Sequence, residues 1–214
     1  MPLTIAIEPH PLLDAGMFEI RFGRPLSSIE TPDVIAQLCR SGAAAPLSVT
    51  DNVKSATRAL LRHTGYKPSG RSKPASEYLA AAFAEQRFPR INAGVDICNV
   101  VSLWSGLPIS VVDVDRLVPP LAIRAAPPGT TYAFNPSGQV IDAGGLLCLY
   151  DADGPSGTPV KDAQRTKTHD DSQNMLAIVW GTHALPGRTA ETVAWYRSLV
   201  EHVSGASLHT VVCT

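Results

Sequence analysis

The sequence predicts an α+β fold in which a β-sheet core of mixed, unusual topology is flanked by helices. Apolar residues make up 44% of the 214 residues, which is enough to fill the core of one domain. Helical patterns dominate up to Pro108, whereas short β-rich runs separated by Pro and Gly dominate after it. This segregation favours α+β over an alternating architecture. We expect a single domain over residues 1–214.

The first half is expected to hold two short strands followed by helices. The strands are expected at Thr4–Ile7 and Phe18–Phe22, with a turn over residues 9–16 between them. Thr31 suits the cap of the next helix, and Pro32 suits its first turn. Helices are expected at Pro32–Cys39, Asp51–Thr64, Ser76–Phe88 and from Asn92 to the residue before Gly106.

The second half is expected to be a strand meander closed by one amphipathic helix, Arg188–Val203, and a last strand, Leu208–Cys213. The runs ISVVDVD, LAIRAA, TTYAF, LLCLYD and MLAIVWG supply its strands. Residues 151–170 are polar and rich in Gly and Pro, which predicts a long mobile loop. Its first residues, DADG, resemble the start of a calcium loop but lack the later acidic ligands, so an ordinary turn is expected.

Charge and cysteine content limit the partners and the compartment. The net charge of -1 does not indicate a nucleic-acid-binding protein, and any polyanion contact would need a local patch. No DNA partner is expected. The N-terminus has no signal-peptide pattern, and no stretch reaches the ~18 apolar residues of a membrane span. A reduced, cytoplasmic location is expected, because the cysteines lack CxxC spacing and are predicted to be small buried hydrophobes: Cys39, Cys98, Cys148 and Cys213.

Familiar catalytic motifs are missing from the sequence. The six histidines show no HxxxH or HExxH spacing, so no metal site is expected. There is no GxSxG nucleophile elbow, Walker loop or GxGxxG motif, so neither a serine nucleophile nor a nucleotide cofactor is expected. Candidate functional residues must therefore be sought in clusters of polar residues that match none of these motifs.

One such cluster is a polar stripe on the expected helix within PRINAGVDICNVVSLWSGLP, residues 89–108. Asn92, Asp96 and Asn99 are separated by four and three residues and share one face, which Ser102 extends. The remaining faces are apolar, so the helix is expected to be buried. Either the stripe caps the helix and ties down loops, or it lines a polar pocket; periodicity alone favours the structural interpretation.

A second cluster is a basic tract between Asp51 and Glu77, which contains no acidic residue. On the helix, Lys54, Arg58 and Arg62 are spaced by four and share a face. Spacing alone favours a solvated helix face, and the functional alternative is a phosphate-contacting surface. The loop that follows adds Lys67, Arg71 and Lys73, with Ser69 and Ser72 beside them, and Arg87 and Arg90 would extend the patch.

A third cluster is HDDSQN, residues 169–174, directly before the apolar run MLAIVW. A capped turn entering a strand explains it, and a pocket wall is the alternative, since strand-entry loops often carry sites. Asp171 and Ser172 are the candidates here.

Taken in order, these segments resemble a known family. INAGVDICNVVSLWSGLPISVVDVDRL, LAIRAAPPGTTY, GLLCLYDADG and DDSQNMLAI are similar to the B3/B4 editing domain of the phenylalanyl-tRNA synthetase β subunit. RALLRHTGYKPSGRSKPASEYL is similar to free-standing B3/B4 proteins. The resemblance covers about residues 54–181. Two pocket positions depart from the synthetase pattern: Ser110 replaces a His and Ile178 replaces a Glu.

The resemblance implies a B3/B4-type fold and hydrolysis of a mischarged aminoacyl-tRNA by water, in trans and without a cofactor. Because of the two departures, the tyrosine specificity of the synthetase domain is not carried over. The expected pocket residues are Asn92, Asp96, Asn99, Ser110, Asp171 and Ser172, and the expected tRNA contacts are Arg58, Arg62, Lys67, Arg71 and Lys73. One alternative is a non-catalytic module that binds tRNA or an amino acid. Another is a small-molecule hydrolase, which no sequence motif supports.

Overall fold

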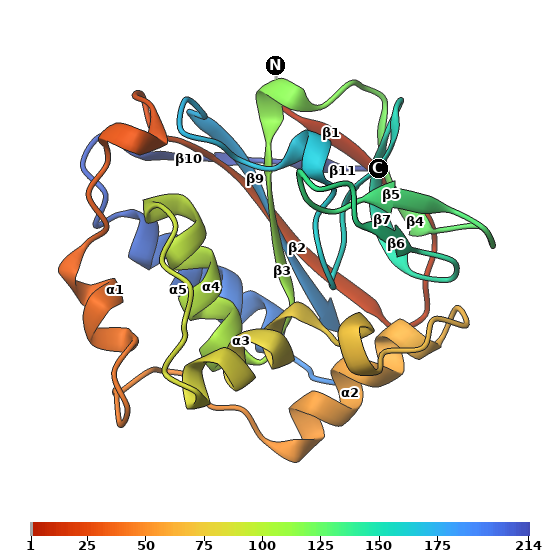
Figure 1. The fold of residues 1–214 in the computed structure, drawn as a ribbon, viewed down its shortest axis with the longest axis horizontal. Coiled ribbons are helices and arrows are strands. Elements are labelled where there is room, and N and C mark those ends of the chain that lie inside the picture. The colour runs from red at the N-terminus through yellow and green to blue at the C-terminus, as the bar shows by residue number, and fades with distance from the viewer. Residues whose placement is uncertain (1) are drawn as a thin grey trace.

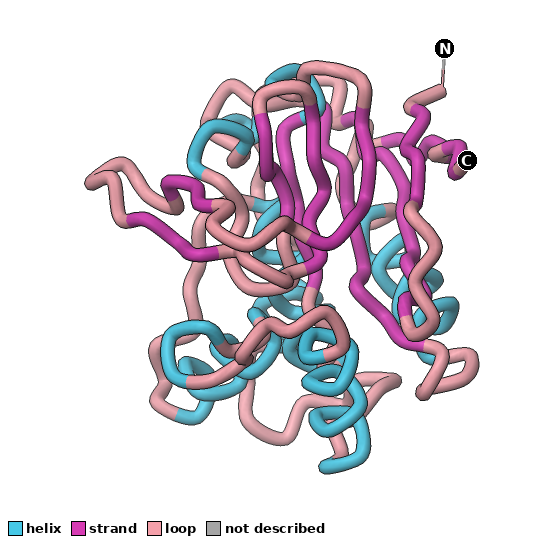
Figure 2. Tube along the Cα trace, turned by 90° about the vertical axis from the view of Figure 1, so that its right-hand side faces the viewer, coloured by secondary structure: helices cyan, strands magenta, loops and turns pink. Residues whose placement is uncertain are grey.

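The computed structural model describes residues 2–214 and has a helical layer, a four-stranded sheet and a five-stranded sheet (Figure 1). One apolar cluster joins the helices to one face of the four-stranded sheet, and a second joins its other face to the five-stranded sheet. Figure 2 shows most of the helical segments gathered below the strands. The predicted α+β class with helix-flanked sheets is confirmed.

The five-stranded sheet has the order β11-β1-β4-β7-β8, and the four-stranded sheet has the order β10-β2-β9-β3. β1 runs parallel to β4 and β11, and the other pairs are antiparallel, which gives the mixed topology that was predicted. The strands are β1 Thr4–Ile7, β2 Leu13–Arg21, β3 Ile109–Asp113, β4 Leu121–Ala125, β5 Thr131–Ala133, β6 Val140–Asp142, β7 Leu147–Asp151, β8 Gly154–Gly157, β9 Asn174–Thr182, β10 Ser207–Thr210 and β11 Val212–Cys213.

Five α-helices are present in residues 2–214: α1 Asp33–Leu38, α2 Asp51–Arg62, α3 Ala75–Ala84, α4 Ala93–Ser105 and α5 Arg188–Val200. α4 packs against α1, α3, α5 and β3, so it is buried on most sides, as its apolar faces predict. Gly94 lets α4 also lie close to β9, since a Cβ there would lie 2.7 Å from the sulfur of Met175 in β9. None of the helices in the described chain has the length and apolarity required to cross a bilayer.

Two strand predictions were wrong in their limits. The expected turn over residues 9–16 is shorter, because Leu13 already pairs with Thr182 of β9 and begins β2. His10 closes the turn by accepting hydrogen bonds from the Leu12 and Leu13 N–H groups. The expected closing strand is two strands, β10 and β11, which belong to different sheets.

The expected mobile loop over residues 151–170 is largely packed. It contains β8 and a short 3-10 helix, Gln164–Thr166, and residues 155–160 are buried. The Arg165 guanidinium pairs with both Asp151 carboxylate oxygens and also donates to the Ser156 hydroxyl. Asp151 accepts the Asp153 N–H, so DADG is an ordinary turn, as predicted. Burial alone would raise the Asp151 pKa, but Arg165 and the backbone donors bring it below its ordinary value.

The cysteine prediction holds for two of the four residues. Cys98 and Cys148 are buried within the two apolar clusters, where burial raises the Cys148 thiol pKa to about 12. Cys213 is exposed because it lies in β11 at the edge of its sheet, and Cys39 is half-buried where α1 ends. For these two residues the prediction of burial was wrong.

Candidate functional site

A cavity of about 490 Å³ opens where α3, α4 and β3 meet the segment that follows β8. Such a volume falls in the range of roughly 300–1,000 Å³ that is typical of small-molecule sites. The cavity combines apolar walls with a few polar groups and is lined by Arg71, Ala75, Tyr78, Leu79, Asn99, Ile109, Phe134, Gln139, Val160 and Lys161.

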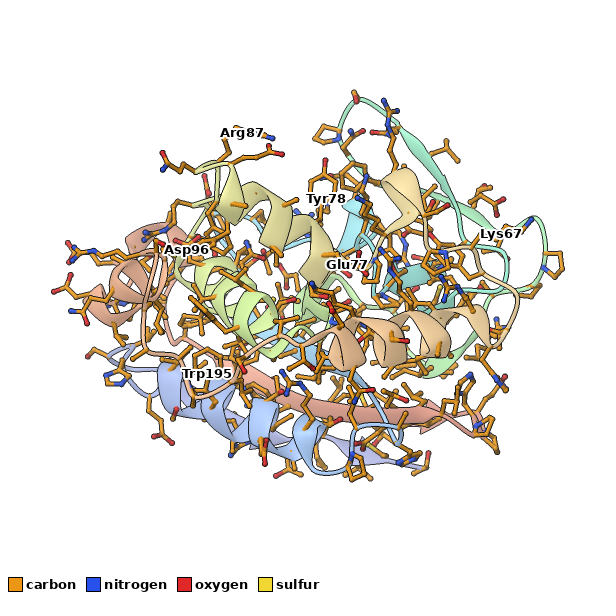
Figure 3. The ribbon with its side chains drawn as sticks, turned by 90° about the horizontal axis from the view of Figure 1, so that it is seen from below. Lys67, Glu77, Tyr78, Arg87, Asp96 and Trp195 are labelled. Atoms are coloured by element: carbon orange, nitrogen blue, oxygen red, sulfur yellow. The ribbon has the colours of Figure 1, made fainter. Side chains whose placement is uncertain are left out.

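The first end of the polar stripe on α4 is structural. Asn92 caps the helix by accepting the Val95 N–H at 3.0 Å. Asp96 is 2% exposed and accepts from the Arg90 Nε at 2.8 Å, the Ile91 N–H at 2.7 Å and the Thr31 hydroxyl at 3.1 Å. Figure 3 places Asp96 away from Tyr78, which marks the cavity. Neither Asn92 nor Asp96 lines the cavity.

The other end of the stripe is open. Asn99 lies on the cavity wall, is half-buried, and its side chain makes no hydrogen bond to any other group within residues 2–214. Its amide can therefore donate and accept toward a ligand. Ser102, one turn further on, instead donates to the Leu107 carbonyl. Of the stripe, only Asn99 lines the cavity.

Ser110 and Ile178, the two positions that depart from the synthetase pattern, lie directly opposite each other in β3 and β9. Both are 0% exposed and lie between the two sheets. The Ser110 hydroxyl donates to the Thr158 carbonyl at 3.0 Å and accepts from the Trp180 indole at 2.9 Å. Successive side chains of a strand point to opposite faces, so Ile109 lines the cavity and Ser110 points into the protein interior. The structure therefore does not place Ser110 at the cavity, where the sequence analysis expected it.

Asp171 and Ser172 lie near the opposite end of β3 from Ile109. The buried Ser172 hydroxyl donates to Asp113, the last residue of β3, whose carboxylate also lies 3.2 Å from the His169 imidazole. Asp171 is exposed. The structure therefore favours the capped strand entry for HDDSQN and does not bring these residues to the cavity.

The basic tract on α2 is partly neutralised. The Arg58 guanidinium on α2 forms a two-point ion pair, at 2.6 and 2.5 Å, with Glu77 in the first turn of α3. Lys54 lies 3.5 Å from Asp51. Arg62, Lys67, Arg71 and Lys73 have no carboxylate within ion-pair distance in the described chain. Of these cations only Arg71 reaches the cavity.

Sequence reasoning missed two lysines near Phe134, of which only Lys161 lines the cavity. Lys161 lines the cavity, with its ammonium 4.3 Å from the Phe134 ring centre and 5.8 Å from that of Tyr78. Lys167 lies 4.2 Å from the Phe134 ring centre. Burial and then the neighbouring Arg71 lower the pKa of Lys161. No local sequence pattern indicates these contacts, since the aromatic partners lie far away in the sequence.

Asp162, also missed, is the acid next to these lysines. Its carboxylate accepts the Thr158 N–H at 3.0 Å and the Val111 N–H at 3.3 Å, and it forms no ion pair with any group of residues 2–214. It is closely surrounded by protein yet keeps partial access to solvent. Burial raises the Asp162 pKa to about 6, although Thr158, Ser110, Lys167 and Val111 act in the opposite direction.

The arrangement offers a neutral amide, uncompensated cations and aromatic rings around one cavity. It offers no metal centre: residues 2–214 contain no group of three or more His, Cys, Asp or Glu side chains arranged to hold an ion. Donors of this kind suit a ligand with both a polar carbonyl and negative charge.

The family model described as the B3/4 domain matches residues 67–189, more than half of the chain. Among solved structures, the N-terminal fragment of the phenylalanyl-tRNA synthetase β subunit from Pyrococcus horikoshii is similar over 99% of this chain, with a TM-score of 0.50 and 13% identity. This chain spans 52% of that fragment. A search of curated proteins gave no match.

Proposed function

Because the chain belongs to the B3/4 domain family, as its sequence pattern indicated, we propose that it is a free-standing editing factor. In this proposal it acts in trans and hydrolyses the ester bond between a tRNA and a wrongly attached amino acid. Hydrophobic pockets discriminate single methylene groups by only about 10–200-fold, so translation needs a separate hydrolytic step.

The observation that carries the proposal is the position of Asn99. It is the last residue of the family-like helix motif INAGVDICN, and it is the one member of the stripe that turns an unused amide into the cavity. Arg71 and Lys161 on the same cavity supply the positive charge that a tRNA end requires.

The proposed reaction needs only water and the residues of this chain. Water attacks the ester carbonyl carbon, forms the new C–O bond, and the bond to the ribose oxygen breaks. The proton released by water ends on that ribose oxygen, giving free amino acid and uncharged tRNA. The Asn99 amide would donate to the oxygen that becomes negatively charged, which is worth roughly 10²–10³ in rate for one donor.

The test is deacylation of a panel of correctly charged and mischarged tRNAs by the purified protein and by Asn99→Ala. Selective hydrolysis of one mischarged species, lost in the variant, supports the proposal. Lys54→Ala serves as the matched control, because Lys54 is exposed and pairs with Asp51 away from the cavity. Hydrolysis that Asn99→Ala leaves unchanged would refute the role given to the amide.

A second function has one observation in its favour. Ser110 and Ile178 replace the ionisable residues of the synthetase pattern with a sealed, uncharged pair. A protein that binds tRNA or an amino acid without hydrolysing it would have this property. Measurable binding together with no turnover across the whole panel would favour this binding module.

A further inference from the structure

Two aromatic rings at the cavity are unusual in their surroundings. Tyr78 lies on α3 (Figure 3) and lines the cavity. It is nevertheless 58% exposed. Phe134, just after β5, lines the same cavity, and the ammonium groups of Lys161 and Lys167 lie close to its ring. Large exposed aromatic side chains beside cations are typical of surfaces on which unpaired bases stack.

The charges on this side of the cavity are uncompensated. Neither Arg71 nor Lys161 has a carboxylate within ion-pair distance among residues 2–214. Arg71 also disfavours the charged form of Lys161, so the two cations repel each other. A phosphate between them would relieve this repulsion and restore their lost solvation.

We propose that Arg71, Tyr78, Phe134 and Lys161 form a subsite for the terminal nucleotide of a single-stranded RNA 3′ end. Its phosphate contacts Arg71 and Lys161, and its base stacks on Tyr78 or Phe134. This inference rests on the proposed function, since it places the nucleotide beside the Asn99 amide that would face the ester. A free phosphate would use the cations but gain nothing from the rings.

This subsite differs from the basic helix face that the sequence pointed to. Arg58 on that face is already paired with Glu77, so a phosphate would have to compete with a carboxylate there. Arg71 and Lys161 at the cavity have no such competitor among the residues that the structure describes. Arg62 on α2 is also without a carboxylate partner in residues 2–214, but it does not line the cavity. The proposal therefore moves the expected focus of RNA binding from α2 to the cavity rim, where cations and aromatic rings lie together.

The test measures binding, independently of hydrolysis, with uncharged tRNA and the same tRNA lacking its 3′-terminal adenosine. Wild type should bind the complete tRNA more tightly. Tyr78→Ala should weaken binding of the complete tRNA by about 5–100-fold and remove most of its advantage over the shortened one. Tyr78→Phe keeps the ring and should bind as wild type, and thermal unfolding checks that each variant is folded.

Lys161→Ala and Arg71→Ala should each weaken tRNA binding and reduce its salt slope by about 0.7, the value for one lost phosphate contact on a single strand. Arg24→Ala, which removes an exposed cation that does not line this cavity, is the control and should change neither. Equal losses for the complete and shortened tRNA in Tyr78→Ala, or an unchanged salt slope in both cation variants, would overturn the subsite.

The two proposals fail separately. If no charged tRNA is hydrolysed but these binding differences appear, the subsite stands and the editing activity is rejected. If mischarged tRNA is hydrolysed with an unchanged KM in Tyr78→Ala and Lys161→Ala, the editing activity stands and the subsite is rejected.

Discussion

The two ends of the polar stripe on α4 look alike in the sequence and differ in the structure. At one end, Asp96 is almost completely buried and its carboxylate accepts three hydrogen bonds from Thr31, Arg90 and Ile91. At the other end, Asn99 is half-buried on the cavity wall, and its amide has no protein partner within residues 2–214. A buried polar group that is fully satisfied holds the fold, whereas an unsatisfied one beside a cavity is free for a ligand.

Asp96→Ala tests the structural end of the stripe and should have the largest effect, a destabilisation of about 3 kcal/mol. The substitution leaves the Ile91 N–H and the Arg90 guanidinium without their acceptor and removes an anion from the first turn of α4. Urea unfolding at pH 7 measures the loss through the midpoint at constant slope. Asp96→Asn keeps one acceptor and should lose less; a loss below about 1 kcal/mol in Asp96→Ala would show that the network adds little.

Asp162 extends the comparison to a second acid, one that pairs with no cation in the described part of the chain. Its carboxyl has a folded pKa of about 6 against an ordinary 3.8, so the folded state holds the proton more tightly than the unfolded state. The resulting stability is present below about pH 3.8 and is lost as the pH rises through about 6. The loss amounts to at most about 3 kcal/mol.

Since other groups titrate in the same range, the measurement is the difference in unfolding free energy between wild type and Asp162→Asn at pH 4.5, 5.5 and 7. Wild type should lose stability relative to the variant as the pH rises. A difference that stays constant across the three values would show that Asp162 titrates as an ordinary carboxyl in the folded protein.

The sequence predicted contacts between residues that are close along the chain better than contacts between residues that are far apart in it. The cap at Asn92 follows from a three-residue spacing, and the confirmed α+β class follows from patterns within short runs. Thr31, by contrast, meets Asp96 across 65 positions, and no local rule reports such a contact. The stripe was therefore visible in the sequence, but its division into a structural end and an open end was not.

The same reasoning explains the basic tract and the cavity cations. Residues 52–76 contain no acid, which suggested free positive charge, but α3 brings Glu77 back to Arg58. Lys161 and Phe134 come together only through the packed segment after β8, which composition alone described as a mobile loop. The family resemblance predicted the fold correctly. It also led us to expect Ser110 in the pocket, but the structure buries this residue in the interior.

Ser110→Ala tests whether that sealed position is structural, and about 1–2 kcal/mol should be lost. The change leaves the buried Trp180 indole N–H without its acceptor. A double-mutant cycle with Trp180→Phe isolates this contact, because Ser110→Ala should cost less once the indole is gone. Additive losses would mean that the hydroxyl acts mainly through the Thr158 carbonyl.

Asn99→Ala should have the smallest effect on stability, within about 0.5 kcal/mol, even though we expect it to slow hydrolysis by roughly 10²–10³-fold. Its side chain gives up no hydrogen bond within the described chain, and alanine is the better helix former in the middle of α4. Asn99→Asp is the matched control: it keeps the shape, replaces the donor with an acceptor, and should also slow hydrolysis while remaining folded. Urea unfolding of both variants beside Asp96→Ala places the two ends of the stripe on one scale. If Asn99→Ala unfolds as easily as Asp96→Ala, Asn99 belongs to the structural network, and the amide is not held in reserve for a substrate.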